Sequence, residues 1–217
     1  MKTIIILLCL LPWFACSQIL RLCQESEAED PDLPQHTING GIYYGEYTAI
    51  VAKALTSLQY QFTIDRLPWR RCKAQVESGA YDGAIGMGWN DERSAKYAFP
   101  EVGNGVPNAD FRIRNVNYPV YVHASSELEW DGTQFSHVKL GITAPKGYLV
   151  EHKLKELNVL LKTDVGVSSW LSLLKNKRVD GIVIVESIGD SMVREDGQND
   201  IRKLDTLFYQ QPVFLVF

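Results

Sequence analysis

Two stretches of this chain repeat one pattern, in which a helix leads through an Asp-Gly pair into a short apolar strand. In the first half, a helix that starts after Pro68 precedes the run at 81–86, which contains Asp82-Gly83. In the second half, a helix through Trp170 precedes the run at 177–185, which contains Asp180-Gly181. Short apolar runs of this kind are typical of buried strands in a parallel sheet. One such unit in each half predicts two similar α/β lobes with a binding cleft between them.

The rest of the first half supplies further elements of the same type. Residues 19–23 alternate like a strand, the polar run 25–35 is predicted to be a loop, and 61–65 is predicted to be the second strand. A helix is expected from Gly40-Gly41 onward, because apolar residues recur at helical spacing between Tyr47 and Leu58. The order strand, helix, strand, helix, strand predicts a parallel α/β sheet.

The segment after the first repeated strand carries the strongest candidate site residue. Gly86 and Gly88 lead into Asn90 and Arg93, which places the guanidinium beyond the carboxyl end of a strand, where open α/β sheets bind ligands. The free N–H groups of such a turn and an arginine side chain together favour an anion. The alternative is a surface arginine that pairs with Glu92 or Asp91.

The stretch from Leu67 to Pro100 resembles the bacterial family 3 extracellular solute-binding proteins, the periplasmic receptors of polar amino-acid importers. The family pattern runs proline-tryptophan-x-arginine, glycine-x-x-aspartate, glycine-x-serine-x-threonine-x-x-arginine, and phenylalanine-serine-x-proline. The corresponding pieces here are Pro68-Trp69-Arg70-Arg71, Gly79-Ala80-Tyr81-Asp82, Gly86 to Arg93, and Phe99-Pro100. The likeness extends from about Ile19 to the last residue and is weakest between Glu101 and Tyr118.

The resemblance implies an α/β, two-lobed periplasmic-binding-protein fold of type II, in which each lobe is a parallel-type sheet flanked by helices. Lobe 1 is then expected at 18–120 with 207–217, and lobe 2 at 121–206. The hinge strands are expected at 117–123 and 208–217. Since the family usually continues for another helix or two that close lobe 1, we also expect lobe 1 to be C-terminally truncated at Phe217.

The resemblance also implies roles for individual residues. Arg93 is expected to form a bidentate pair with a ligand carboxylate. Gly88 and Asn90 stand where the family has serine and threonine, so only their backbone groups are available, and recognition of a standard α-amino acid is in doubt. Gly147 and Tyr148 lie at a predicted helix N-terminus, where the backbone amide is expected to bind a carboxylate. Glu186 follows the place of the family's amine-binding aspartate by one position, so it either binds ligand or points to the other face of its strand.

Four aromatic residues are candidates for the walls of the cleft: Trp69, Trp89, Tyr43 and Tyr44. Trp89 follows the two glycines directly, and the two tyrosines are expected at the start of the first helix. For Trp69, packing in the core is the stronger alternative. Asp82 and Asp180 are expected to brace turns.

The N-terminus resembles a secretory signal. Lys2 precedes the apolar run 3–11, which is too short to cross a bilayer, and Ala15-Cys16-Ser17 fits cleavage before Gln18. Residues 1–17 are therefore predicted to be a signal peptide and the mature chain to be periplasmic. In the alternative, Cys16 is the lipidated first residue.

Composition and spacing argue against several other functions. The formal net charge is −4 and basic and aromatic residues form no stripe, so a nucleic-acid partner is not expected. The histidines at 36, 123, 137 and 152 have no metal-ligand spacing, and no cofactor is expected. After signal removal two cysteines remain, Cys23 and Cys72. An exported protein is able to pair them, but we expect two buried thiols.

No nucleophile, base and orienting group converge in the sequence, and no phosphate-binding or dinucleotide fingerprint is complete. We therefore expect a monomeric receptor that closes on a small-molecule ligand and delivers it to a membrane ABC permease. The first alternative is a periplasmic enzyme on the same fold, resembling dehydratases of prephenate-like acids, with Glu186 as the acid near Arg93. The second is a ligand-sensing module, which the lack of a transmembrane or kinase segment in the sequence makes less favoured.

Overall fold

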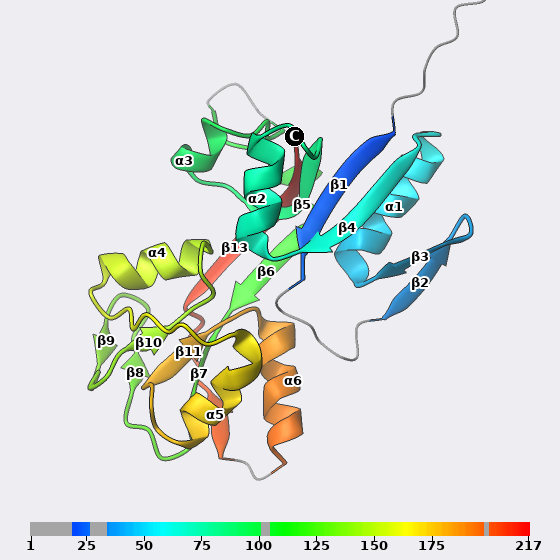
Figure 1. The fold of residues 1–217 in the computed structure, drawn as a ribbon. Helices are drawn as coiled ribbons and strands as arrows, with labels where there is room; N and C mark the ends of the chain where they lie inside the picture. The colour runs from blue at the N-terminus through cyan, green and yellow to red at the C-terminus, as the bar shows by residue number, and fades with distance from the viewer. Residues whose placement is uncertain (1–18, 27–33, 101–104, 198–199) are drawn as a thin grey trace, which may run out of the picture.

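The computed structural model describes residues 19–26, 34–100, 105–197 and 200–217. The predicted signal peptide at 1–17, with Cys16 and the cleavage site before Gln18, lies outside these residues. The described chain forms two main sheets with helices packed on them (Figure 1). No helix in the described ranges is both long and apolar enough to cross a membrane.

The first sheet has five strands and is built from both ends of the chain. Its strands, in order across the sheet, are β4 (Phe62–Leu67), β1 (Leu20–Glu25), β5 (Gly83–Gly88), β13 (Tyr209–Val216) and β6 (Arg114–Tyr118). β4, β1 and β5 are parallel, whereas β13 is antiparallel to both of its neighbours. The expected parallel order is therefore present in the first three strands, and the returning chain completes a mixed sheet.

Helices cover both faces of the first sheet. Leu22 packs with α1 (Glu46–Ser57), whereas its neighbour Cys23 packs with α2 (Trp69–Glu77). Successive side chains of a strand point to opposite faces, so the two helices lie on opposite sides. The short helix α3 (Asp91–Ser94) follows β5.

The second sheet has four strands. In order across the sheet these are β10 (Ile142–Thr143), β11 (Gly181–Val183), β7 (Val120–His123) and β12 (Ile201–Lys203). β10 and β11 are parallel, but β7 is antiparallel to both β11 and β12, so this sheet is mixed and not purely parallel. Around it lie α4 (Leu149–Glu156), α5 (Trp170–Lys175) and α6 (Glu186–Asp196).

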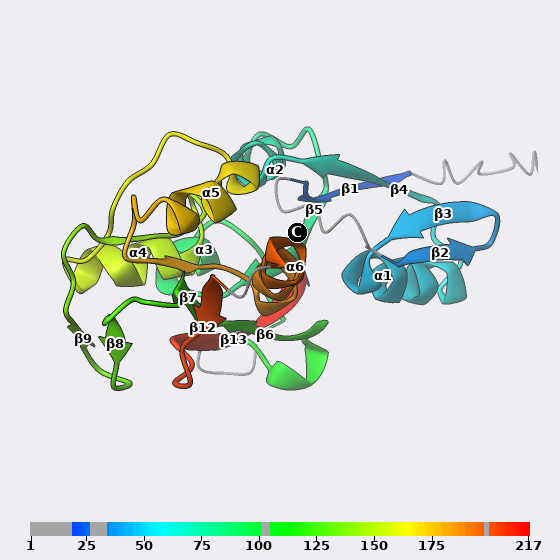
Figure 2. The ribbon, with the colours of Figure 1, turned by 90° about the horizontal axis from the view of Figure 1, so that it is seen from below.

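Small elements complete the fold. They are the hairpin of β2 (Gln35–Ile38) and β3 (Gly41–Tyr44), the hairpin of β8 (Glu129–Trp130) and β9 (Phe135–Ser136), and the 3-10 helices Ala109–Phe111 and Val167–Ser169. The two hairpins lie at opposite ends of the molecule in both views (Figures 1 and 2).

The chain passes between the two sheets at two places. β6 leads through Pro119 directly into β7, and residues 204–208 connect β12 back to β13. Two short crossings side by side are the layout of a hinge. The lobe boundaries at 120/121 and 206/207 remain a prediction.

The predicted start of the first helix, at Gly40-Gly41, is wrong. Asn39 and Gly40 both have positive φ, 47° and 80°, and form the turn of the β2–β3 hairpin. This Asn-Gly pair is the preferred sequence of a two-residue hairpin turn. The helix begins only at Glu46, so Tyr43 and Tyr44 lie on β3 and not at a helix start.

The expectation of two free thiols is also wrong. Cys23 and Cys72 form a disulfide with a Cα–Cα distance of 5.7 Å. Both residues are fully buried in one core cluster between β1 and α2. The two cysteines are 49 residues apart in the chain, so their proximity cannot be predicted from local sequence. The packing of the helix on the strand brings them together.

Candidate functional site

A cavity of about 440 Å³ lies between elements of the two sheets. From the second half of the fold it is lined by Tyr148, Leu149, Val185, Ser187 and Ile188. From the first half it is lined by Gln24, Glu25, Pro34, Tyr44, Gly45, Glu46, Tyr47, Thr48, Arg66, Trp69, Ile85, Gly86, Gly88, Arg93, Arg114, Val116, Tyr118, Gln211 and Val213. A volume of this size accommodates a small molecule.

Two glycines of β5 line this cavity. Gly86 has φ of 89° and faces the ring of Tyr47, and Gly88 ends the strand. Gly86 ends the expected strand run 81–86 and Gly88 was expected beyond it, but β5 spans Gly83–Gly88 and includes both glycines. At Gly86 the absence of a side chain leaves room for a ligand close to the backbone, whereas the space beside Gly88 is filled by the Gln211 amide.

Arg93 is buried, with 7% of its surface exposed, and it lines the cavity. Asn90 caps the short helix α3, since its Oδ1 accepts from the backbone N–H of Arg93 at 2.9 Å. The guanidinium Nη1 donates to the carbonyl oxygen of Gly88 at 2.8 Å, and Nη2 donates to that of Gly147 at 2.9 Å. The central guanidinium carbon, Cζ of Arg93, lies 6.0 Å from the centre of the Trp69 ring. Arg93 thus contacts both halves of the fold.

The charge of Arg93 is not neutralised by a carboxylate in the described ranges. Glu92 forms an ion pair with Lys96 at 3.6 Å, and none of the ion pairs among the described residues includes Arg93. Burial lowers the pKa of the guanidinium, which nevertheless stays protonated in proteins. Because a guanidinium has five N–H donors, Arg93 retains donors for an anionic group beyond its two carbonyl bonds.

Gly147 and Tyr148 bring the second half of the fold against the first. The Gly147 carbonyl also accepts from Lys73 Nζ at 3.2 Å, and the Tyr148 hydroxyl donates to Glu25 Oε2 at 3.0 Å. The Tyr148 ring meets Trp69 edge-on, with centroids 6.4 Å apart. The Gly147 N–H, predicted to bind a carboxylate, instead donates to Glu151 Oε2 at 2.6 Å. In this arrangement the two halves are held together by direct bonds.

Five of the ten predicted site residues line the cavity. These are Tyr44, Trp69, Gly88, Arg93 and Tyr148. Asn90 and Gly147 line a smaller pocket of about 70 Å³ that shares Arg93 with the cavity. The remaining three, Tyr43, Trp89 and Glu186, are absent from the lining of both pockets.

Each of these three residues makes its contacts outside the two pockets. Tyr43 stacks on Phe62 at 5.9 Å between centroids. Trp89 packs against the core cluster that contains Cys72 and Phe214, and its buried Nε1 has no hydrogen-bond partner among the described residues. Since it follows Gly88 at the end of β5, its side chain leaves the strand on the side away from the cavity.

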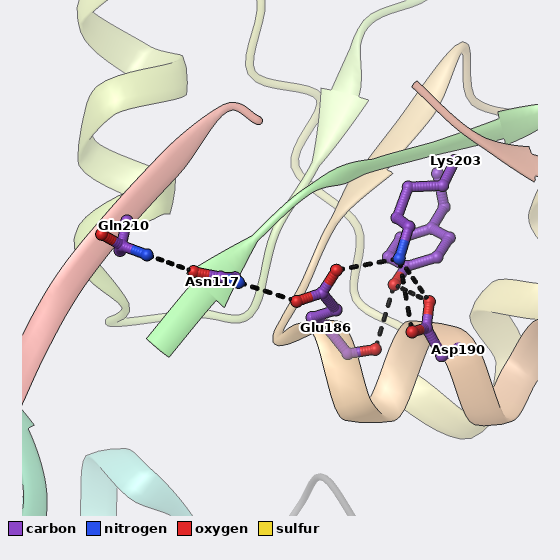
Figure 3. A network of polar contacts seen from close by, with 6 residues as sticks. Asn117, Glu186, Asp190, Lys203 and Gln210 are labelled. Carbon is purple, nitrogen blue, oxygen red and sulfur yellow. Dashed lines mark hydrogen bonds and ion pairs between the residues drawn. The ribbon is translucent and has the colours of Figure 1, made fainter. Parts of the chain in front are cut away.

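Glu186 belongs to a polar network beside the chain crossings (Figure 3). Its Oε2 accepts from Asn117 Nδ2 and its Oε1 from Lys203 Nζ, both at 2.8 Å. These bonds lower the pKa of the Glu186 carboxyl group, with Lys203 as the main cause. Lys203 also pairs with Asp190 at 3.0 Å, and Asn117 accepts from Gln210 at 2.7 Å. The strand ends before Val185 and α6 begins at Glu186, which turns this side chain toward the crossing strand β6.

The two repeated aspartates brace turns in the structure. Asp180 Oδ2 accepts backbone N–H groups of Lys139, Leu140 and Gly141 at 2.5–2.7 Å. Asp82 Oδ2 accepts the backbone N–H of Arg21 at 2.7 Å.

Several polar residues of the lining were not predicted from the sequence, because they are far apart in the chain. Arg114 pairs with Glu46 at 2.6 Å and lies 5.3 Å from the Tyr47 ring centre. Tyr118 is buried, which raises the pKa of its hydroxyl. The only usable indication was the position of Tyr118 and Gln211 in the expected hinge strands. In the described ranges, no three His, Cys, Asp or Glu side chains are grouped so as to hold a metal ion.

The two sheets and the cleft define a two-lobed α/β fold, and solved structures of binding proteins with that fold superpose on the chain. An arginine-, lysine-, histidine-binding protein from Geobacillus stearothermophilus matches with a TM-score of 0.69 and 13% identity, over 92% of this chain and 82% of the other. An amino acid ABC transporter substrate-binding protein from Streptococcus pneumoniae, bound to L-arginine, matches with a TM-score of 0.65 and 19% identity, over 91% and 80%. The GluR0 ligand-binding core from Nostoc punctiforme, in complex with L-glutamate, matches with a TM-score of 0.66 and 10% identity, over 91% and 84%.

At these identities the likeness establishes the fold, and the predicted two-lobed α/β fold is confirmed. No protein-family model matches the chain, and no curated protein matches it.

Proposed function

We propose that this protein is a periplasmic solute-binding protein that captures a small polar ligand bearing a carboxylate by lobe closure and delivers it to an ABC importer. The observation that carries the proposal is the cavity of about 440 Å³ between the lobes. Its wall contains the buried Arg93, which forms no ion pair with a carboxylate of the described residues. A guanidinium in such a place fits a carboxylate in a bidentate pair. The fold neighbours bound to L-arginine and to L-glutamate support an amino acid or a related molecule.

In this proposal Arg93 binds the carboxylate, and Trp69, Tyr44 and Tyr148 form aromatic walls. Gly88 lines the cavity, and its lack of a side chain makes space for the Gln211 amide. The lobes are 18–120 with 207–217 and 121–206, which is supported by the chain crossings at Pro119 and 204–208. Closure about these crossings brings Tyr148 and Gly147 onto the first lobe.

No observation favours the enzyme alternative. The dehydratase-like hypothesis needs Glu186 as an acid beside a substrate held by Arg93. Glu186 instead bonds to Lys203 and Asn117 and does not line the cavity. We therefore propose a non-catalytic, monomeric receptor whose protein partner is the membrane permease.

Thermal-shift screening of the purified chain against L-arginine, L-glutamate, the other amino acids and small organic acids tests the proposal. A ligand raises the melting temperature by mass action, and lobe closure reduces the radius of gyration in small-angle scattering. A best ligand without an anionic group, or a tight ligand that changes neither quantity, contradicts it. Mass spectrometry of periplasmic protein with an N-terminus at Gln18 supports the localisation, and a diacylglycerol-modified Cys16 revises it.

A further inference from the structure

The final strand β13 carries a buried side chain amide into the cavity at Gln211. Gln211 has 6% of its surface exposed and lines the cavity. Its Nε2 donates to the Tyr118 hydroxyl at 3.3 Å, whereas its Oε1 is buried and has no hydrogen-bond partner in the described part of the chain. Buried amide oxygens are almost always paired, so an unpaired one at a cavity wall indicates a missing donor.

The Gln211 amide fills the space that a side chain at position 88 would occupy. Gly88 pairs with Val213 in the register of β5 and β13, and Gln211 lies two residues away on the same face. A Cβ built on Gly88 would come within 2.6 Å of Gln211 Nε2 and closer still to Oε1. The glycine at 88 and the glutamine at 211 are therefore complementary: the first makes the space that the second fills.

The position of the amide relative to Arg93 limits the ligand. Arg93 Nη1 bonds the carbonyl of Gly88, the residue against which the Gln211 amide packs. Arg93 and the Gln211 amide therefore both border Gly88. A ligand that bonds to both side chains would carry its donor near its carboxylate, as on the neighbouring carbon.

The charge of the lining decides which donor fits. The residues at the start of α6 that face the cavity are Val185, Ser187 and Ile188, which carry no charge. The two acidic residues of the lining have partners other than Gln211: Glu46 pairs with Arg114, and Glu25 accepts from the Tyr148 hydroxyl. An ammonium group prefers a carboxylate partner, whereas a hydroxyl is satisfied by a neutral amide oxygen.

We propose that Gln211 is a specificity-determining residue that accepts a hydrogen bond from the hydroxyl group of a 2-hydroxy acid, and that this protein prefers 2-hydroxy acids to the matching 2-amino acids. This inference rests on the proposed function and names the ligand class of the same cavity.

Two matched series of probes test the preference by calorimetry. The four-carbon series is L-malate, succinate and L-aspartate, and the three-carbon series is L-lactate, propionate and L-alanine. In each series the members differ only by hydroxyl, hydrogen or ammonium at the carbon next to the carboxylate. The hydroxy acid of at least one series is expected to bind about tenfold more tightly than its two counterparts, the effect of one hydrogen bond.

Variants assign the preference to Gln211. Gln211→Met keeps the volume but removes the amide, and it is expected to reduce the hydroxyl preference to about twofold or less. Gly88→Ser alone is expected to weaken binding, since the new side chain collides with Gln211. The double variant Gly88→Ser with Gln211→Ala is expected to restore part of the preference, because the serine hydroxyl then occupies the freed space. Gln61→Ala, which removes an exposed amide outside the cavity lining, is the control and is expected to bind as wild type.

The outcomes separate the two proposals. If a 2-amino acid, including L-arginine or L-glutamate, binds more tightly than every hydroxy acid, the inference about Gln211 is overturned and the receptor function stands. An unchanged hydroxyl preference in a folded Gln211→Met variant has the same consequence. If none of the amino acids and organic acids in the screen binds to the wild-type protein, the proposed function fails and this inference fails with it.

Discussion

The Arg93 guanidinium donates to the carbonyl oxygen of Gly147 at 2.9 Å, so the proposed ligand-binding arginine also ties one lobe to the other. In an open state this bond is broken and the N–H becomes available. A ligand carboxylate that binds the remaining donors of Arg93 is therefore expected to favour the closed arrangement, because both sets of bonds converge on one side chain.

Replacing Arg93 is expected to weaken binding of the best ligand from the screen at least tenfold. Arg93→Ala removes a charge-assisted pair worth about 1.5–3 kcal/mol. Calorimetry with Arg71→Ala, an exposed arginine on α2, as the matched control measures the effect. Equal affinity of folded Arg93→Ala and wild type would contradict the assignment. Arg93→Lys is expected to recover little, since lysine cannot form the planar fork.

Removing the Tyr148 hydroxyl is expected to shift the unliganded protein toward an open state. Tyr148→Phe deletes the bond to Glu25 but keeps the edge-on contact with Trp69. One hydrogen bond contributes about 0.5–1.5 kcal/mol, enough to change the population of a two-state hinge several-fold. Small-angle scattering without ligand should show a larger radius of gyration than that of wild type. An unchanged value would show that this bond does not hold the lobes together.

Loss of the disulfide is expected to destabilise lobe 1. The Cys23–Cys72 bond closes a loop with a sequence separation of 49 and joins β1 to α2. Constraints of this kind contribute about 2–4 kcal/mol. The free energy of unfolding in urea should fall by that amount in the Cys23→Ala, Cys72→Ala double variant, which adds no polar group to the buried cluster. A reductant should lower the stability of wild type but not that of this variant. Equal stability of reduced and oxidised wild type would be inconsistent with the bond.

The Glu186 network predicts a pH dependence with a defined sign. Lys203 lowers the pKa of Glu186 below its ordinary value of 4.5, so the stabilisation by Glu186 is present above that pH and is lost as the pH falls through the folded-state pKa. Glu186 in turn raises the pKa of Lys203 above 10.5, so the contribution of Lys203 is present below that pH and is lost as the pH rises through the higher folded-state value.

Lys203→Met is therefore expected to reduce stability by about 0.2–1 kcal/mol at pH 7, the range for partly exposed pairs, and by less at pH 3. Thermal unfolding of both proteins at the two pH values measures the difference. A variant that loses the same stability at pH 3 as at pH 7 would show that the lysine acts by packing and not by charge.

Local patterns were sufficient where the determinants are close together in the chain. Pro68 and the helical spacing after it predicted α2, and the Asp-Gly pair with its apolar run predicted β11. The hairpin of β2 and β3 lies where the sequence predicts a helix start, because Asn39-Gly40 forms a two-residue turn and the helix begins only at Glu46. The signal and the lobe boundaries remain predictions from the same local patterns.

Local sequence patterns were enough to predict the class of fold, because hydrophobic period and turn residues act within one element and its neighbours. Which distant residues meet depends on the packing of the elements. This packing paired Cys23 with Cys72, packed Gln211 against Gly88 and turned Glu186 toward Lys203. Each of these contacts depends on strand order and helix placement, and a shift of one residue at a strand end sends a side chain to the opposite face.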